Sequence, residues 1–539
     1  MKEWIANIFR QPDEQRFPIV WPPEQCAIYD WLAKWPEATG VLPQAAMTLP
    51  DEPVAQDGED LLRWAPGALD GVFSHHVAND SHQEKAAQVT QAIIRVLRRS
   101  SSKNMQAFYQ LAKQDTPLGF IDDLLRMMGA SQAIDARRLR ALVLFLATQA
   151  PDRQVVKLAM ALMAFFPYQQ SVNILQTLGS HDEFTLYAVV AMRAILPPEE
   201  FALAWLALAK RTAGWGRIHL IERLPETPDH ALRQWLLREG YKNEVMVEYT
   251  AWHCAEYGLL HDALAGEVDA QLLQGAAEIL RGMISGEPGP GIGEYTYAVQ
   301  ACERYLAHIL PGSAGDLLHY KVAGEIGRLM GEETFASEAE REHLRGLCEQ
   351  IRALPEWPAL IEAGLHDDDS MIFHTALQLC REQEGDPWPA IYQRHREKPE
   401  SVLWYQLMQT DNPDHIAQVI ALAESELDLT AISCGPQKSQ GRGPLYQQHS
   451  ALSFVLQDLS RFPGQGWILI RTGLKSPMTF SRNKALNALE AWPQASLPAE
   501  AVAILAEAKS REPEKELQDR LAQLLEQLVD KHKRLICRL

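Results

Sequence analysis

From about residue 104 onward, hydrophobic residues recur three and four positions apart, a spacing that predicts amphipathic α-helices. These Leu- and Ala-rich stretches are separated at short intervals by Pro, Gly, Asp or Ser, the residues that end or cap helices. No segment shows the alternation of apolar and polar residues that a half-buried strand requires. The pattern therefore predicts an all-α fold with many helices.

Several predicted helices end in the same way, with apolar residues three apart and a proline directly after the last one. Proline lacks an N–H group and disfavours helix in the residue before it, so it ends each helix where the apolar stripe ends. The instances are Leu144/Ala147/Ala150/Pro151, Met160/Met163/Phe166/Pro167, Ile218/Ile221/Leu224/Pro225, Cys348/Ile351/Leu354/Pro355, Leu456/Leu459/Phe462/Pro463 and Leu486/Leu489/Trp492/Pro493, with Tyr29/Leu32/Trp35/Pro36 as an outlying copy.

The spacing of these helix stops predicts a repeat. Pro167, Pro197 and Pro225 lie 30 and 28 residues apart, and Pro463 lies 30 residues before Pro493. Such a distance accommodates a pair of helices and two turns. One pair cannot bury its apolar stripe alone, but stacked pairs share a continuous core, so we predict an α-solenoid of stacked antiparallel helix pairs.

The helix-stop pattern and the Ala/Leu-rich second helices, such as FSRNKALNALEAWP and SMIFHTALQLC, resemble HEAT and armadillo-like helical repeats over roughly residues 104 to 510. Two other stretches, GWGRIHLIERL and WLLREGYKNEVMVEYTAWHCA, are similar to segments of a poorly characterised bacterial family, some of whose members are labelled limonene hydroxylase. The first resemblance implies a helical solenoid. The second implies an oxygenase activity but assigns no catalytic residue.

The two ends of the chain differ from the repeats. The first hundred residues hold five tryptophans and many prolines, and residues 515 to 535 form one clean amphipathic stripe. Because terminal repeats must cover an apolar face, we expect a cap at each end. The predicted organisation is an N-terminal Trp/Pro-rich cap (1–103), helical repeats (104–284), a Gly/Pro loop (285–295), helical repeats (296–432), a Gly-rich loop (433–444), and helical repeats with a C-terminal capping helix (445–539).

Charge and cysteine content narrow the class of partner. The 51 Lys and Arg against 70 Asp and Glu leave a net charge of −19, which repels a phosphate backbone, so nucleic acid is not expected as a partner. The longest apolar tracts are too short for a membrane span, and the N-terminus lacks a signal pattern. Seven cysteines without paired spacing fit a reduced compartment. We expect a cytoplasmic protein, monomeric or weakly oligomeric.

Motifs for catalysis and for cofactor binding are missing from the sequence. It contains no HExxH, and its ExxH from Glu340 to His343 occurs once, whereas a carboxylate-bridged di-iron bundle needs two such motifs and two further acids. It has no GxSxG elbow, and neither loop supplies a phosphate-binding GxxxxGK[ST]. We predict no catalytic residue, no metal and no cofactor.

One predicted helix, residues 243 to 260, carries the best candidate surface for a partner. Acidic and aromatic residues recur on it at four-residue intervals, which suits recognition of a basic or apolar peptide. The alternative is that its rings pack on the neighbouring repeat. The locally basic loop 433–444 is a second candidate, for a partner or an anion. The candidate partner-binding residues are Glu248, Tyr249, Trp252, His253, Glu256, Tyr257, Lys438 and Arg442.

The stretch RTAGWGRIHLIERL (211–224) crowds charged residues around two glycines and a tryptophan. On a helical projection Leu220, Ile221 and Leu224 form its buried stripe with Ile218 at the edge, and His219, Glu222 and Arg223 point outward. Arg217 falls at the centre of the apolar face, where a charge needs a partner. We predict a structural, buried ion pair between Arg217 and a carboxylate of an adjacent helix, Glu248 or Glu256.

These observations favour a non-catalytic helical-repeat scaffold that binds a protein or peptide partner through a concave acidic and aromatic face. A basic partner would suit the negative charge of the chain. Two alternatives remain open: an enzyme, such as an oxygenase, with a site between helices, and an inhibitor or immunity protein for a basic target.

Overall fold

The computed structural model describes residues 17–35, 40–52, 64–76, 83–312, 315–331, 336–439, 441 and 446–536. Within these ranges the regular secondary structure is helical, apart from one isolated β-bridge between Ser439 and Met478. The prediction of an all-α fold is confirmed.

The helices divide into two compact units, of which the first ends at Pro355 and the second begins at Glu356. The α-helices of the first unit are α2 (Ile28–Leu32), α3 (Ala68–His76), α4 (Gln83–Arg98), α5 (Ser102–Ala112), α6 (Ile121–Ala130), α7 (Ala136–Gln149), α8 (Arg153–Leu162), α9 (Gln169–Gly179), α10 (Thr185–Ile195), α11 (Pro198–Ala209), α12 (Trp215–Ile221), α13 (His230–Trp235), α14 (Glu248–Gly258), α15 (Leu260–Ala263), α16 (Ala270–Ser285), α17 (Ala298–Ile309), α18 (Leu317–Leu329) and α19 (Glu338–Arg352).

The second unit contains the remaining helices of the chain. Its α-helices are α20 (Trp357–Gly364), α21 (Ser370–Glu382), α22 (Trp388–Glu397), α23 (Ser401–Met408), α24 (Pro413–Glu426), α25 (Leu429–Ile432), α26 (Gln447–Asp458), α27 (Trp467–Leu474), α28 (Thr479–Ala491), α29 (Ala501–Arg511) and α30 (Lys515–Ile536).

Two of the proline helix stops, at Pro151 and Pro493, act as the sequence predicts, whereas α8, α12, α19 and α26 end at Leu162, Ile221, Arg352 and Asp458, further from the prolines that follow them. Helix α7 ends at Gln149, and its C-cap residue Ala150 is extended directly before Pro151. In the second unit, α28 ends at Ala491 and Trp492 is extended before the next proline. The extended backbone at both positions is the conformation that a following proline favours.

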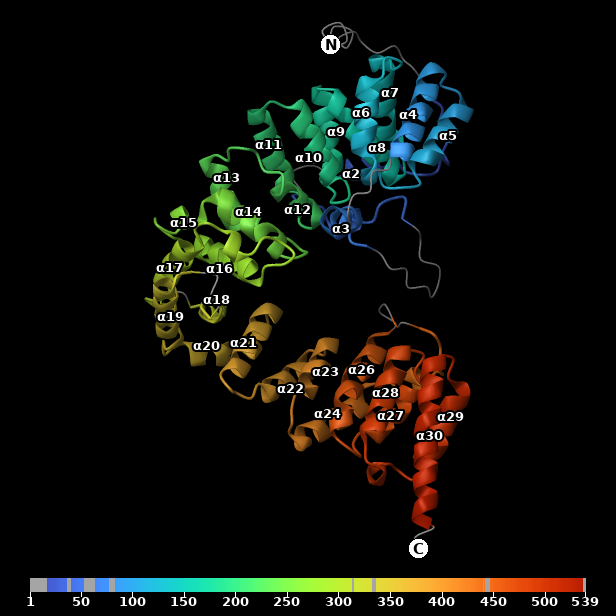
Figure 1. The fold of residues 1–539 in the computed structure, drawn as a ribbon, viewed down its shortest axis with the longest axis vertical. Helices are drawn as coiled ribbons and strands as arrows, with labels where there is room; N and C mark the ends of the chain where they lie inside the picture. The colour runs from blue at the N-terminus through green and yellow to red at the C-terminus, as the bar shows by residue number, and fades with distance from the viewer. Residues whose placement is uncertain are drawn as a thin grey trace. The chain divides into compact units, whose positions relative to one another are not determined.

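In each unit, helices that are not consecutive along the chain contact one another, and in the first unit these are every second helix. The series in the first unit runs from α8 through α10, α12, α14 and α16 to α18, and the series in the second runs from α23 through α26 and α28 to α30. Figure 1 shows this succession within the first unit as a gradual change of colour along neighbouring helices. Packed helix pairs therefore share one core within each unit.

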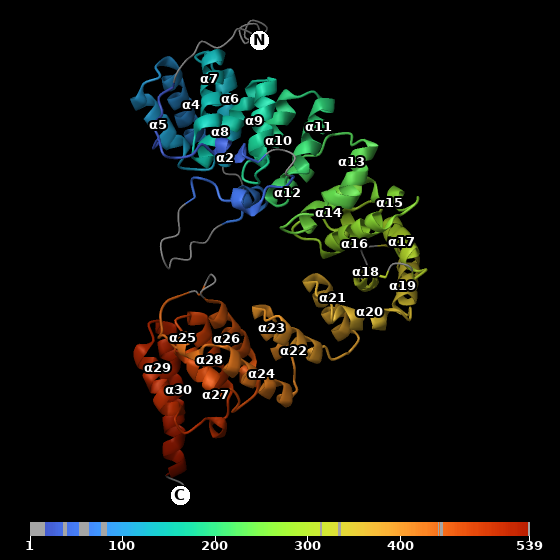
Figure 2. The same cartoon turned by 180° about the vertical axis from the view of Figure 1, so that it is seen from behind.

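The N-terminal segments lie against helices that come much later in the sequence. Helix α2 contacts α7 and α9, and the Ile28 N–H donates a 3.2 Å hydrogen bond to the Ala150 carbonyl. The ring of Trp21 lies between those of Tyr109 and Phe145, with centroids 4.9 and 5.6 Å away. Helix α3 contacts α12, as both views in Figures 1 and 2 show. These segments add tertiary contacts outside the alternating helix series.

At the other end, α30 packs on α28 and α29. It buries leucines at three- and four-residue spacing, which is the stripe that the sequence predicts. These residues are Leu517, Leu521, Leu524 and Leu528.

Candidate functional site: a buried polar junction and an open groove

The loop between α9 and α10 is polar and yet buried. Loops normally run over the surface, so a buried run of polar residues needs partners for each group. Residues 180 to 185 were not singled out by the sequence analysis, because their charges look like an ordinary solvated turn. The buried polar side chains of this loop are Ser180, His181, Asp182, Glu183 and Thr185.

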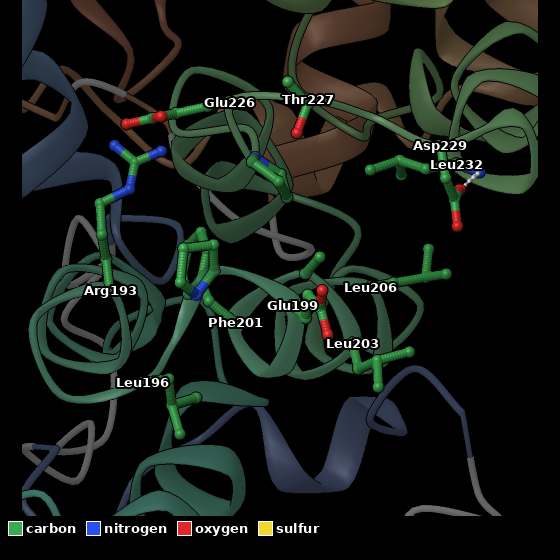
Figure 3. Close-up of a pocket in the computed structure, with 13 residues that line it drawn as sticks. Arg193, Leu196, Glu199, Phe201, Leu203, Leu206, Glu226, Thr227, Asp229 and Leu232 are labelled. Carbon is green, nitrogen blue, oxygen red and sulfur yellow. Dashed lines mark hydrogen bonds between the residues drawn. The ribbon is translucent and has the colours of Figure 1, made fainter.

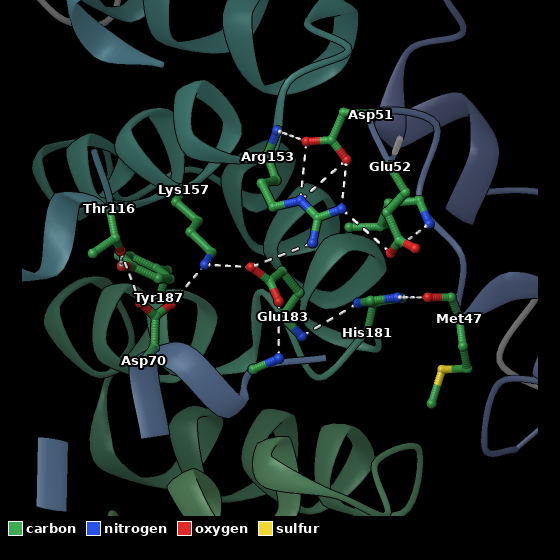
Figure 4. A network of polar contacts seen from close by, with 12 residues as sticks. Met47, Asp51, Glu52, Asp70, Thr116, Arg153, Lys157, His181, Glu183 and Tyr187 are labelled. Carbon is green, nitrogen blue, oxygen red and sulfur yellow. Dashed lines mark hydrogen bonds and ion pairs between the residues drawn. The ribbon is translucent and has the colours of Figure 1, made fainter. Parts of the chain in front are cut away.

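Glu183 belongs to an ion network whose centre, formed by Lys157, Asp70 and Glu183, is nearly inaccessible to solvent (Figure 4). The Lys157 ammonium, on a side chain that is 1% exposed, donates to Asp70 at 2.7 Å and to Glu183 at 2.6 Å. Arg153 binds Asp51 through two nitrogens at 2.8 and 3.0 Å and lies 3.9 Å from Glu183. Burial raises the pKa of Glu183, but the Lys157 ammonium, the Arg153 guanidinium and the Gly67 N–H together outweigh burial and hold the pKa below its ordinary value.

Further hydrogen bonds attach this network to other segments. The Thr116 hydroxyl donates to Asp70 at 2.8 Å and lies 3.3 Å from the Tyr187 hydroxyl, and burial raises the pKa of Tyr187. The Glu183 N–H donates to Nδ1 of His181, whose Nε2 lies 3.3 Å from the Met47 carbonyl. Burial lowers the pKa of His181 to about 4, so this ring is neutral at pH 7. The network therefore joins α3, α8 and α10 to the segment around residue 50.

Asp182, which lies between His181 and Glu183 in the same loop, is the reason why the GWG sequence needs two glycines. Its carboxylate accepts a 2.9 Å hydrogen bond from the Gly214 N–H at the start of α12. A Cβ atom at Gly214 would lie 2.3 Å from Oδ2 of Asp182, and one at Gly216 would lie 2.5 Å from Oδ1. Only glycine leaves room for this contact. Burial raises the pKa of Asp182 to about 7, although the Gly214 N–H opposes the shift.

Trp215, between these glycines, fixes α3 on α12. A Cβ atom at Gly71 of α3 would lie 2.2 Å from the indole ring, so the two elements meet at a position where only glycine fits. Trp215 shares a buried cluster with Ala68, Ile218 and Tyr249. The stretch RTAGWGRIHLIERL is therefore a structural joint in its first half.

Arg217 is buried, with 7% of its surface exposed, as predicted. Its guanidinium donates to the main-chain carbonyls of Thr212 at 2.7 Å, Glu239 at 3.0 Å and Lys242 at 3.2 Å, and lies 5.0 Å from the centre of the Trp235 ring. Hydrogen bonds to these carbonyls, and not the predicted ion pair with Glu248 or Glu256, therefore hold the Arg217 side chain. The carbonyl oxygens accept hydrogen bonds from the two terminal nitrogens of the guanidinium without a second ion, and the buried Nε has no hydrogen-bond partner among the described residues.

The outward orientation predicted for His219 is wrong. Its side chain is fully buried, as are Leu220, Ile221 and Leu224 of the predicted stripe. A helical projection assumes one buried face, but α12 contacts α3 as well as α10, α11 and α14. Burial lowers the pKa of His219.

The predicted partner surface on α14 is divided between core and exterior. Tyr249 is buried with its ring 5.1 Å from Trp215, so for this residue the packing alternative holds. Trp252 and His253 are half-buried and contact edge to face, with ring centroids 5.2 Å apart. Tyr257 is 38% exposed.

The two acids of this surface, Glu248 and Glu256, are half-buried. Glu248 lines a cavity of about 320 Å³ together with Arg281 and Glu325. Loop 285–295 packs beside it, since a Cβ atom at Gly289 would lie 2.0 Å from the Glu248 carbonyl oxygen. Burial of Glu248 therefore arises from neighbouring segments as well as from its own helix.

The basic loop candidates lie in the second unit. Lys438 is exposed, and its ammonium lies 3.5 Å from Glu514. Arg442 lies outside the described residues. The structure therefore brings Trp252 and His253 together and leaves Lys438 on a separate unit.

An open groove lies between α11 and the connection from α12 to α13 (Figure 3). Its volume is about 500 Å³, within the usual range of ligand sites. Its floor and walls are mainly apolar, and its rim carries charges. The residues that line it include Leu196, Phe201, Leu203, Leu206 and Leu232, with Arg193, Glu199, Glu226, Thr227 and Asp229 at the rim.

The part of the chain that the structure describes contains no cluster of three His, Cys, Asp or Glu side chains arranged to hold a metal ion. None of its described helices combines the length and the apolar character that crossing a bilayer requires. Glu340 of the ExxH motif belongs to a capping box at the start of α19, in which its carboxylate accepts a hydrogen bond from the Ser337 N–H.

Comparison with known protein families, with curated proteins and with solved structures yields no match to this chain.

Proposed function

We propose that this protein is a non-catalytic helical-repeat protein that binds a protein or peptide partner in the cytoplasm. In this proposal the helix pairs of each unit form a HEAT-like α-solenoid, and the N-terminal segments and α30 cover its terminal helices. The alternating series of helix contacts supports the solenoid, because stacked repeats meet through equivalent helices.

The functional proposal rests on one observation: the charged network of the first unit is buried, whereas several apolar and aromatic side chains are exposed. Lys157, Asp70 and Glu183 are nearly inaccessible to solvent, and the Lys157 ammonium pairs with both carboxylates. A catalytic acid or base must reach a substrate, whereas a binding surface needs exposed apolar or aromatic anchors. Leu203 on α11 and Tyr257 on α14 supply such anchors.

A basic target, as for an inhibitor or immunity protein, is the second candidate. The acids at the rim of the groove, Glu199, Glu226 and Asp229, favour it. Charge complementarity of this kind accelerates association and selects among partners. Lys438 and Arg442 remain predicted contacts for a partner or an anion.

Affinity purification of the tagged full-length protein from cells that naturally express it tests the proposal. We expect a protein partner recovered in stoichiometric amount. Tyr257→Ala should reduce the recovery, whereas Tyr297→Ala, at 39% exposure against 38% for Tyr257, serves as the matched control. Absorbance spectra and metal analysis of the same material complete the test. Stoichiometric iron, flavin or haem without a protein partner would contradict the proposal and favour the oxygenase alternative.

A further inference from the structure

Helix α11 has two apolar faces, of which the structure covers one. Phe201, Trp205 and Leu208 are buried, and the Trp205 indole N–H donates a 3.0 Å hydrogen bond to the Leu220 carbonyl. On another face Leu203 is 73% exposed, with Ala202 and Leu206 half-buried beside it. A helix that is apolar on both sides is normally buried on both.

This second face forms one wall of the 500 Å³ groove, and Figure 3 shows Leu203 and Leu206 along it. The α11 residues of the wall run from Pro198 to Leu206, which spans about 12 Å of helix. That length accommodates about two helical turns of a polypeptide segment lying along α11. The opposite wall comes from the connection between α12 and α13.

The charges around the groove favour a cationic occupant. Glu199, Glu226 and Asp229 are exposed at its rim. The Arg193 guanidinium donates to the Leu224 carbonyl and lies 5.3 Å from the centre of the ring of Phe201, another residue that lines the groove. The acids therefore outnumber the single base, and the base already has an acceptor. This arrangement repels nucleic acid and anionic lipid and attracts lysine and arginine.

We propose that the groove between α11 and the α12–α13 connection binds a basic amphipathic segment of a partner protein. Leucine-sized side chains of the segment lie against Leu203 and Leu206, and its lysines or arginines face the three rim acids. An amphipathic helix in an apolar groove is a recurrent mode of peptide recognition. The inference rests on the proposed partner-binding function and specifies its site and the chemistry of the partner.

Fluorescence anisotropy with a labelled synthetic peptide tests the inference. The probe has about 15 residues of Leu, Ala and Lys, with leucines on one helical face and lysines beside them. We expect it to bind about tenfold or more tightly than a version with glutamate for lysine, and to weaken as salt rises from about 50 to about 500 mM.

Two variants locate the binding. Leu203→Gln should weaken binding of the lysine peptide about tenfold, because it removes an apolar anchor. Met371→Gln, in the second unit, is the matched control, since Met371 is 74% exposed and Leu203 is 73% exposed. Glu226→Lys should also weaken binding and flatten its salt dependence. Equal affinity of Leu203→Gln and wild type, or equal affinity for the glutamate peptide, would overturn the inference.

Partner capture and the peptide titration together distinguish a failure of this inference from a failure of the proposed partner-binding function. If Leu203→Gln and wild type capture the same natural partner equally well, partner binding stands and the groove is not its site. If the wild type captures no partner, the proposed function fails, and the peptide titration alone then decides whether the groove recognises basic amphipathic segments.

Discussion

Each of the two units buries an ion pair, but the two pairs connect segments that lie at different separations along the chain. In the first unit Lys157 on α8 reaches Asp70, which precedes it by 87 residues, and Glu183, which follows it by 26. In the second unit Arg482 on α28 binds Glu512 through two hydrogen bonds of 2.7 and 2.8 Å, 30 residues further on. Both cations are nearly inaccessible to solvent.

The difference in sequence separation shows that buried ion pairs connect two different kinds of segments in this protein. The 30 residues between Arg482 and Glu512 match the spacing from Pro463 to Pro493, so this pair links successive helix pairs. Lys157 instead attaches α3, which lies outside the alternating helix series. A buried pair destabilises strongly when one partner is removed, so each contact can be tested by a single substitution.

Lys157→Ala should have the largest effect. It leaves Asp70 and Glu183 buried close to the vacated site, and we expect a loss of about 3 to 5 kcal/mol. Hydrogen exchange should show lost protection in α3 and α8. Lys85→Ala is the matched control, because Lys85 lies 2.7 Å from Asp115, the same separation, in a partly exposed pair. A change of under about 1 kcal/mol is expected there. Equal effects of the two substitutions would refute the structural role of the network.

Glu512→Ala should rank second, with a loss of about 3 kcal/mol confined to the second unit. The effect is smaller because Arg482 keeps its hydrogen bonds to the Ser476 and Pro477 carbonyls. Hydrogen exchange of α28 to α30 measures it. Glu490→Ala removes a partly exposed partner of Arg520 and serves as the control. Loss of protection in the first unit would contradict the assignment of this pair to the second.

Arg217→Ala should cost less again, about 2 kcal/mol, because it leaves carbonyl oxygens rather than an unpaired ion. Urea unfolding followed by hydrogen exchange of α12 to α14 measures the loss. Arg223→Ala, which removes a partly exposed pair with Glu222, is the control. If Arg217→Ala kept full stability and lost partner binding, the joint would be a binding site.

His219→Leu should have the smallest effect, and the effect depends on pH. Burial holds the pKa of His219 below 6.5 in the folded state, so the unfolded chain binds a proton that the folded chain does not as pH falls. Stability is therefore lost below about pH 6.5, and the variant should lose about 1 kcal/mol less than wild type between pH 7.5 and 5.5. Thermal unfolding at both pH values compares them, and identical pH dependence of the two proteins would contradict the neutral, buried ring.

Much of the architecture was predictable because it depends on local chemistry. Periodicity and proline position gave correct helix ends at Gln149 and Ala491, since a proline acts on the residue beside it. The burial of Leu220, Ile221 and Leu224 followed from helical spacing. Capping residues behaved in the same way, as Asp369 shows at the start of α21.

The buried polar contacts of residues 180 to 185 were not predictable in this way. The charges of residues 180 to 185 look like a solvated turn, and their partners lie up to 134 residues away, as in the contact between His181 and the Met47 carbonyl. Two signals existed in the sequence: a lysine inside the apolar stripe of α8, and paired glycines around Trp215. Neither identifies a partner, because spacing along one helix carries no information about distant segments.

The sequence by itself determined the helical class, the helix ends at Gln149 and Ala491 and the burial of Leu220, Ile221 and Leu224, because proline chemistry and amphipathic spacing act within a few residues. Only the tertiary structure decided that Arg217 binds carbonyls, that His219 is buried, and that Tyr249 and Tyr257 of the predicted partner surface separate into core and surface. It also decided which apolar face of α11 stays uncovered. These outcomes depend on which distant segment covers a given face, and that choice follows from the packing of the whole unit.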